Sequence, residues 1–475
     1  MRNLAISAFT AMLAACAVGP DYHPPQSEAP AAFVGGQEAS FVPDEVQSEF
    51  WKAFHDPQLD QLVEQALAAN HDIRIAGANL QRARALRGES RLDLGPTITA
   101  SGSRTETKAS ERQLQGAPAS NRERQYYDAG FDAAWELDVF GRVRRGVEAS
   151  NAELGAAQAS LKDVQITVSA EVARNYFELR GLQRELAVAQ RNADNQRTTL
   201  NLTHARLDAG TGTDLDTARA QAQLESTLAV IPSLQAGVSR SIFRLGVLTG
   251  HTPEALIAEL ALPRELPALP SNLHIGTPEA LLRRRPDLRV AERELAAATA
   301  RVGVSVADLF PKISLLGSFG YDATQASALG NSSAETYAFG PVISWAALDL
   351  GRVRQRIRGD RAAADGALAR YEQAVLLALE DTEASLTTYA RSRDRQERLR
   401  GAAQASAQAA RIAQLRFDGG VASFLDVLDA QRTLLGAESD LARGDTEMAT
   451  ALVAVYKALG GGVGGASLGG PAPQG

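Results

Sequence analysis

The chain has 475 residues, of which 45% are hydrophobic and only 5% aromatic. This is ample apolar material for a core, and the composition favours long helices over a β-sandwich. The net charge of −7 and the pI near 5.6 argue against a nucleic-acid partner. The single cysteine, Cys16, excludes an internal disulfide.

The N-terminus has the features of a cleavable export signal. Residues 1–15 carry one early positive charge and an apolar run too short to span a bilayer, followed by small residues. The stretch Leu13-Ala14-Ala15-Cys16 resembles a bacterial lipobox, so we expect a signal peptide at 1–15 and a lipid on Cys16. A free buried cysteine is the alternative. Ala17, in place of aspartate, points to the outer rather than the inner membrane.

Past this signal, no apolar run approaches the roughly 18 residues of a membrane helix. Any membrane crossing is therefore expected to use strands.

An internal repeat dominates the rest of the chain. Residues 206–224 (RLDAGTGTDLDTARAQAQL) correspond to residues 416–434 (RFDGGVASFLDVLDAQRTL) at an offset of 210. The sequence GRVR at 141–144 and 351–354 keeps this offset, which becomes 215 upstream of a polar stretch at 105–124 that we interpret as a loop. We predict a lipid-anchored extended segment at 16–50, two copies of one unit at 51–274 and 275–460, and a flexible glycine-rich tail at 461–475.

Each copy is predicted to begin with a helix of about 30 residues, which in the second copy follows the start signal Thr277-Pro278-Glu279. A β-hairpin follows, at about 96–136 and 311–347. Residues 127–135 and 337–345 alternate with a period of two, and their partners at 96–104 and 311–321 alternate more weakly. Strands of about ten residues suit a membrane, although a hairpin packed on a helix has the same pattern.

Trp135 and Trp345 occupy equivalent positions at the ends of two of these strands. Aromatic residues are typical of membrane interfaces, so we expect both rings at the end of a membrane-spanning sheet. Packing in a core is the alternative.

Long helical stretches follow at 142–207 and 352–417, and a second helix in each copy extends to Gly250 or Gly460. Pro232 is expected to bend or break the first of these second helices. Such helices are predicted to pack as antiparallel hairpins, with tips at about 206–216 and 416–429. Gly210 and Gly420 suit the left-handed residue that ends a helix at each tip.

Four strands in one chain cannot close a barrel, and a bilayer does not tolerate open sheet edges. The chain must therefore associate with copies of itself or not cross a membrane at all. A dimer would supply eight strands and a trimer twelve, and rotational symmetry alone does not choose between them.

Several motifs, in order, resemble the TolC-like outer-membrane efflux factors, and among them the NodT group of lipoprotein channels of resistance-nodulation-division pumps. They are CAVGPDYHPP from Cys16, FWKAFHDPQLDQLVEQALAANHDI at 50–73, WELDVFGRVR at 135–144, RRRPDLRVAE ending at 292, and the two tip stretches. The resemblance covers roughly residues 16 to 460. It implies an α+β membrane protein, a homotrimer with a 12-stranded β-barrel (four strands per chain) continued by a long periplasmic α-helical barrel.

The resemblance also implies a function and partners. The chain would be the outer-membrane exit duct of a tripartite efflux pump for small molecules, anchored by lipid, extending into the periplasm and in contact with outer-membrane lipids. A periplasmic adaptor protein would open it, and an inner-membrane resistance-nodulation-division transporter would supply energy and select substrates. The duct of a protein or oligosaccharide secretion system is one alternative, and a lipid-anchored periplasmic helical scaffold is another.

By the same resemblance, residues of the tips would contact the adaptor: Arg206, Leu207, Gly210, Leu215, Arg416, Phe417, Gly420 and Leu425. Two plain turns are the alternative. Asp426 and Asp429 are three residues apart and share a helix face, so threefold symmetry would place six carboxylates at a pore constriction, where like charges raise their pKa values. Solvated surface acids are the alternative. The family gate can use a basic residue near the second tip, where this chain has Ala422 and Ser423.

We expect no enzyme activity and no cofactor. The six histidines have no zinc-binding spacing, and the chain has neither a nucleophile elbow nor a phosphate-binding Walker loop.

Overall fold

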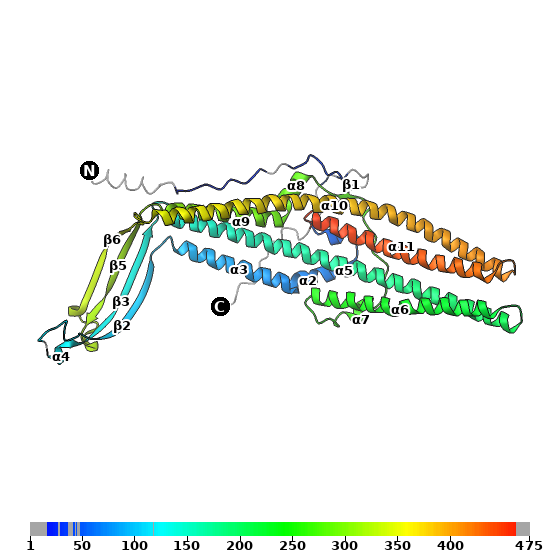
Figure 1. Ribbon diagram of the computed structural model, residues 1–475, viewed down its shortest axis with the longest axis horizontal. Helices are drawn as coiled ribbons and strands as arrows, with labels where there is room; N and C mark the ends of the chain where they lie inside the picture. The colour runs from blue at the N-terminus through cyan, green and yellow to red at the C-terminus, as the bar shows by residue number, and fades with distance from the viewer. Residues whose placement is uncertain are drawn as a thin grey trace. The chain divides into compact units, whose positions relative to one another are not determined.

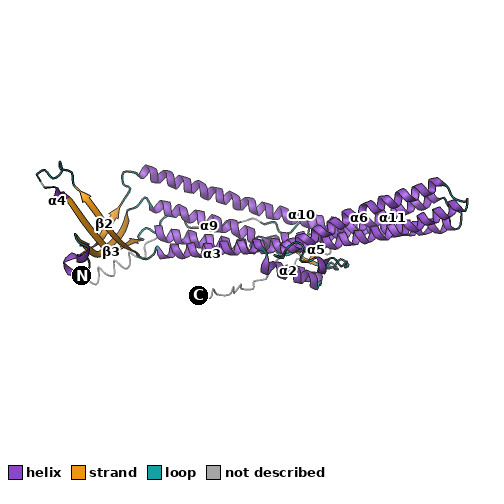
Figure 2. Ribbon diagram, turned by 90° about the horizontal axis from the view of Figure 1, so that it is seen from below, coloured by secondary structure: helices purple, strands orange, loops and turns teal. Residues whose placement is uncertain are grey.

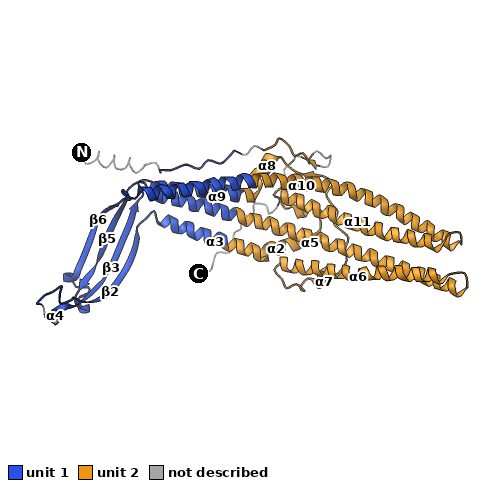
Figure 3. Ribbon diagram, in the orientation of Figure 1, with its two compact units in different colours: residues 1–26, 79–158, 289–373 blue, residues 27–78, 159–288, 374–475 orange. Residues whose placement is uncertain are grey.

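The computed structural model describes residues 17–26, 29–36, 41–42, 44, 48–116 and 118–461. The predicted signal, Cys16 and residues 462–475 of the predicted tail lie outside these described residues. The chain divides into two compact units (Figure 3). Unit 1 contains residues 1–26, 79–158 and 289–373, and unit 2 contains residues 27–78, 159–288 and 374–475.

Unit 1 carries one four-stranded antiparallel sheet in the order β2-β3-β5-β6 (Figures 1 and 2). Its strands are β2 (Thr97–Lys108), β3 (Glu123–Leu137), β5 (Lys312–Ala323) and β6 (Glu335–Ser344). Short helical turns lie in the connections, namely α4 (Ala119–Arg122), η2 (Ala326–Ala328) and η3 (Ser332–Ala334). The predicted pairs of strands are thus present, and β3 pairs with β5 to join the two hairpins.

The first hairpin lies where it was predicted, at about 96–136, but its strands are longer than expected. Residues 105–108 and 123–124 belong to strands, so the loop expected at 105–124 is too long. Lys108 pairs with Glu123, and their side chains form an ion pair of 2.5 Å. All side chains of β2 are exposed, so its sequence does not need to alternate between apolar and polar residues. The alternation that predicts a strand is therefore missing beyond residue 104.

The helix predicted at the start of each copy is two helices. They are α2 (Pro57–Ala69) and α3 (His71–Leu92) in the first copy, and α8 (Pro278–Arg284) and α9 (Pro286–Ala307) in the second. Asn70 is extended and its side chain caps α3, accepting hydrogen bonds from the backbone N–H groups of Asp72 and Ile73. Arg285 is extended because Pro286 follows it. The predicted start signal is confirmed, since the Thr277 hydroxyl accepts from the backbone of Ala280.

Two helical hairpins follow (Figure 1). The first consists of α5 (Arg142–Asp208) and α6 (Asp214–Leu248), and the second of α10 (Leu350–Asp418) and α11 (Phe424–Ala458). Of the two outcomes expected at Pro232, a bend or a break, the break is wrong, because α6 continues through this residue. Pro232 is exposed, so water can satisfy the carbonyl group that the missing N–H leaves free.

The core of unit 2 is aromatic. Phe50, Trp51 and Phe54 of η1 (Phe50–Phe54) are buried against Phe177 of α5 and Tyr456 of α11. The connection between the two copies contains α7 (Ile257–Leu260) and β4 (Leu273–His274), and β4 pairs in parallel with β1 (Phe41–Val42). Among the described residues, no helix combines the length and the hydropathy needed to cross a membrane.

Candidate functional site

The two hairpin tips have the same backbone geometry. Gly210 has φ +70° and Gly420 has φ +74°, the left-handed conformation expected at the end of a helix. Gly210 N donates to the Leu207 carbonyl, as Gly420 N does to that of Phe417. A residue with a Cβ would be strained at either glycine, so these positions fix the turn.

The start of each returning helix is capped in the same way. Thr213 Oγ1 donates to Asp216 Oδ2 at 2.7 Å, and its oxygen accepts from Asp216 N. In the second tip, Ser423 and Asp426 form a reciprocal capping box, in which Ser423 N and Oγ both donate to Asp426 Oδ2. Ser423 therefore serves as the cap of α11.

These bonds set the charge of Asp426. The Ser423 hydroxyl and backbone N–H, with a smaller contribution from Arg416, lower the pKa of this exposed carboxyl. This direction is opposite to the rise expected from a ring of like charges, which would require other copies of the chain. Asp429 is exposed on the same helix, so both carboxylates remain available for the predicted ring.

The tips of the two hairpins are joined to each other. The Arg206 guanidinium lies 3.9 Å from the centre of the Phe417 ring and donates to the Phe417 carbonyl at 2.9 Å. Phe417 also contacts Phe424, with ring centres 5.7 Å apart. Both rings belong to a buried cluster contributed by all four hairpin helices: Ala193, Leu200, Ala220, Leu224, Phe417, Phe424 and Val427.

The predicted adaptor contacts therefore differ in exposure. Leu215 and Leu425 are more than half exposed, and Arg416 is exposed as well. Arg206 and Leu207 are half-buried, and Phe417 is only 5% exposed. The exposed apolar residues of the two turns thus include Leu215, Leu425 and also Val421, which the sequence reasoning did not single out.

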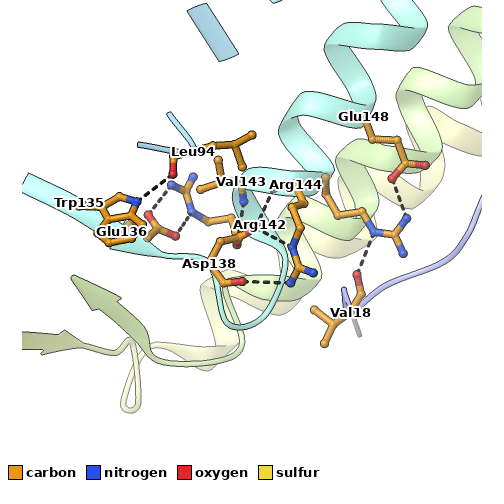
Figure 4. Close-up of polar contacts among 10 residues, drawn as sticks. Val18, Leu94, Trp135, Glu136, Asp138, Arg142, Val143, Arg144 and Glu148 are labelled. Atoms are coloured by element: carbon orange, nitrogen blue, oxygen red, sulfur yellow. Dashed lines mark hydrogen bonds and ion pairs between the residues drawn. The ribbon is translucent and has the colours of Figure 1, made fainter. Parts of the chain in front are cut away.

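In unit 1, Trp135 and Trp345 lie at two equivalent junctions between helices and strands. Trp135 Nε1 donates to the Leu94 carbonyl at 2.9 Å, between α3 and β2, as Figure 4 shows. Trp345 Nε1 donates to the Leu309 carbonyl at 3.0 Å, between α9 and β5. Trp135 lies inside β3 rather than at its end, and Trp345 directly follows β6. Each indole is thus bonded to the backbone just before the neighbouring strand, β2 for Trp135 and β5 for Trp345.

The first junction also holds the segment that follows Cys16. Arg145 is 4% exposed and donates to the Val18 carbonyl, to Asp21 at 2.6 Å and to Glu148 at 2.8 Å. Val18 N donates to the Phe140 carbonyl, and a Cβ at Gly141 would meet Ala17. The sequence reasoning missed this contact, since Arg145 resembles any exposed arginine of a helix.

Within the described part of the chain, no three His, Cys, Asp or Glu side chains are grouped closely enough to hold a metal ion. The sites described above consist of long helices, tight hairpin turns and a sheet. Their polar side chains cap helix ends or hold neighbouring segments together.

The chain is similar to known proteins over nearly its whole length. The sequence profile of the family "Outer membrane efflux protein" matches residues 62–251 and 277–461. "Nodulation protein T" of Rhizobium leguminosarum bv. trifolii is 32% identical over 456 residues, with 96% of each chain covered. "Probable efflux pump outer membrane protein TtgC" of Pseudomonas putida is 30% identical, with 97% of this chain and 95% of that protein covered.

A solved structure of the outer-membrane channel OprN superimposes with a TM-score of 0.88 at 44% sequence identity. The match covers 94% of this chain and 99% of the other.

Proposed function

Because the chain belongs to the outer membrane efflux protein family, we propose that it is the outer-membrane exit duct of a tripartite efflux pump for small molecules. The proteins it resembles are named as outer-membrane channels and efflux-pump components, which is a class of transport protein and not of enzyme. The observation that carries the proposal is a chain with two long helical hairpins and one four-stranded sheet, whose outer strands pair on one side only among the described residues.

The open edges favour closure by copies of the same chain. Within the described residues, β2 pairs only with β3 and β6 pairs only with β5. The four strands alternate in direction, so β6 of one copy meets β2 of the next as another antiparallel pair. Three copies give the 12-stranded barrel of the proposed homotrimer, and closure removes every edge.

The sheet has the dimensions and the surface for a membrane. Its strands contain 12, 15, 12 and 10 residues, and a tilted membrane strand needs about 9–11. Phe131, Phe319 and Tyr337 are paired across three strands and all are exposed. Such a row of exposed rings suits contact with outer-membrane lipids.

The tips would meet a periplasmic adaptor protein. Leu215 and Leu425 protrude from equivalent positions of the two tips, which gives an adaptor the same apolar contact in each copy. Asp426 and Asp429 would form the pore constriction. The inner-membrane transporter partner, the lipid on Cys16 and the repeat boundaries at 51–274 and 275–460 are parts of the same proposal.

The native mass of the detergent-extracted mature protein, followed by its conductance in a planar bilayer, tests the proposal. We expect three chains with one lipid-modified N-terminus each, and discrete channel openings. A monomer that stays in solution without detergent and does not conduct would instead support the lipid-anchored scaffold.

A further inference from the structure

A cavity of about 340 Å³ lies in unit 2, where α5, α10 and α11 meet. Its wall carries five carboxamide side chains, those of Asn192, Asn195, Gln196, Gln414 and Gln431. Two threonines add hydroxyl groups, while two leucines and an alanine supply apolar surface. None of the described lining residues has an ionisable side chain. The cavity therefore combines many neutral hydrogen-bonding groups with apolar surface.

Two of the carboxamides have polar atoms without a partner. Gln196 is 3% exposed, and neither its Nε2 nor its Oε1 has a hydrogen-bond partner among the described residues. Gln431 Nε2 donates to Thr199 Oγ1 at 3.0 Å, but Gln431 Oε1 has no partner there either. A buried polar atom left without a partner costs about 1–3 kcal/mol. One donor and two acceptors of the cavity wall thus remain for a bound molecule.

Two of the other carboxamides are held by the protein itself. Asn192 Nδ2 donates to the Val188 carbonyl and to Glu438 Oε2, both at 2.9 Å. Gln414 Nε2 donates to Asp418 Oδ1 at 2.8 Å. These bonds fix the wall before anything binds, which lowers the ordering cost of binding.

The second copy of the repeat shows that the helix does not need these polar side chains. At the offset of 210, Asn192, Asn195, Gln196 and Thr199 correspond to Ala402, Ala405, Ser406 and Ala409. The helix α10 is continuous through these four positions. Buried polar groups cost stability unless they are hydrogen-bonded. Their presence on α5 therefore points to a role other than helix formation.

We propose that this cavity binds a small neutral molecule with adjacent hydroxyl groups, a polyol or a single sugar unit. Two hydroxyls donate to Gln196 Oε1 and Gln431 Oε1, and one of them also accepts from Gln196 Nε2. A charged ligand would lose its hydration without meeting a counter-charge in the wall, which is costly. The site lies within one chain, so the inference goes beyond the proposed duct and does not depend on it.

Water is the alternative occupant. The volume corresponds to about eleven water molecules at roughly 30 Å³ each. Water would satisfy the free amide atoms but would also cover Leu202 and Leu434, whose apolar surface gains from leaving water. The carbon skeleton of a polyol or sugar packs on this surface while its hydroxyls reach the amides. Asn195 and Thr198 are exposed, so a ligand can enter from solution.

Saturation-transfer NMR of the detergent-extracted mature protein tests the proposal, with glycerol and glucose as the two probes. The detergent must have no sugar headgroup, because such a headgroup would compete for the site. Gln196→Met keeps the length of the side chain and removes its free donor and acceptor. Gln190→Met is the matched control, since Gln190 is an exposed glutamine of the same helix.

We expect the signal of at least one probe to saturate as its concentration rises, with the same Kd for the unmodified protein and for Gln190→Met. Gln196→Met should raise the Kd about tenfold or more, because two hydrogen bonds are lost. Its midpoint of thermal unfolding without a probe should not fall, as it would if Gln196 only supported the fold. A cavity that holds water only would give no saturable signal with either probe and would overturn the proposal. Equal binding by Gln196→Met would do the same.

Ala410→Leu provides a second test that leaves every amide in place. Ala410 is 9% exposed and lines the cavity, and the first copy has the buried Leu200 at the equivalent position. The larger side chain takes up part of the cavity, so we expect a folded protein, verified by its thermal unfolding, that has lost the saturable signal. Binding of both probes with unchanged Kd would place them elsewhere on the protein and contradict the proposal.

Discussion

At the first strand-to-helix junction, the Asp138 carboxylate accepts from the backbone N–H groups of Val143 and Arg144 at 3.0 and 2.8 Å (Figure 4). At the second junction, Leu348 stands in the equivalent place and is fully exposed. The side chain of the neighbouring Asp349 forms an exposed ion pair with Arg352 at 3.0 Å. The tryptophan bonds are the same at both junctions. In the part of the chain that the structure describes, the side-chain cap and the docked segment at Val18 occur only at the first junction.

This difference shows which features belong to the repeated unit and which belong to one copy. The backbone plan, the indole bonds and the tip turns are shared. The side chains that fasten one segment to another are concentrated in one copy or between the two copies. Leu348 at the second junction is not covered by any described segment of its own chain, so this junction remains available to another chain.

The largest effect is expected at Arg145. Arg145→Ala removes a buried guanidinium that bonds the Val18 carbonyl, Asp21 and Glu148, at a cost of about 3 kcal/mol to the local structure. Hydrogen exchange measured by mass spectrometry should be about a hundredfold faster in the peptide that contains Val18.

Gln355→Ala is the matched control, because Gln355 is the exposed equivalent of Arg145 in the second copy. It should leave exchange unchanged. Equal exchange in the two variants would mean that the segment after Cys16 is held by other contacts.

The contact at Arg145 also illustrates what the sequence does not contain. The offset of 210 predicted both hairpins and both tip turns, and glycine and helix-cap chemistry placed the tips to within a few residues. Arg145 and Asp21 are 124 positions apart, and nothing local distinguishes this arginine from its neighbours. The same applies to Arg206. Its partner Phe417 belongs to the other copy of the repeat, and only the folded structure shows that the two side chains are in contact.

Positions at which the two copies differ in residue type were the available signal for these contacts. Phe417 replaces a leucine of the first tip and Phe424 replaces an aspartate, and both turn out to be buried. The breaks at Asn70 and Arg285 were harder to predict. Asn70 donates to the carbonyl of Leu248, and Arg285 donates to that of Ala458 at the equivalent position. Two different residue types thus make the same bond, and the shared function is visible only in three dimensions.

The helix cap at the first junction should give the second largest effect. Asp138→Ala removes the acceptor of two backbone N–H groups in the first turn of α5 and should cost about 1–2 kcal/mol. Asp349→Ala removes only an exposed ion pair and should cost less than about 0.5 kcal/mol. Hydrogen exchange of the first turns of α5 and α10 measures both, and equal costs would refute the contrast between the junctions.

The tryptophan bonds should instead give equal effects. Trp135→Phe and Trp345→Phe each keep an aromatic ring but lose one N–H donor to a carbonyl group, which costs about 1 kcal/mol. The midpoint of thermal unfolding of the detergent-extracted protein should fall by the same amount in both variants. A difference between them would show that the two indoles do more than tie strand ends to the preceding turns.

The smallest effect is expected at Asp163, where the second copy has the neutral Gln373. Burial, with repulsion from Asp287, raises the pKa of Asp163 against the opposing attraction of Arg285 and Lys457. A carboxyl group whose pKa is raised by folding destabilises the fold at pH values above its folded pKa. This cost disappears as the pH falls below the unfolded value of about 3.9, where the group is protonated in both states.

Asp163→Asn should therefore raise the free energy of unfolding at pH 7 by less than about 1 kcal/mol, because the carboxyl is only partly buried and solvent screens its surroundings. The gain should vanish near pH 3. Asp163→Glu keeps the charge and should show no such gain at pH 7. Denaturant midpoints of the three proteins at both pH values measure the effect. A lower midpoint for Asp163→Asn at pH 7 would mean that attraction to Arg285 and Lys457 outweighs the burial of the carboxylate. The charged residue of the first copy would then stabilise its position better than a neutral residue does.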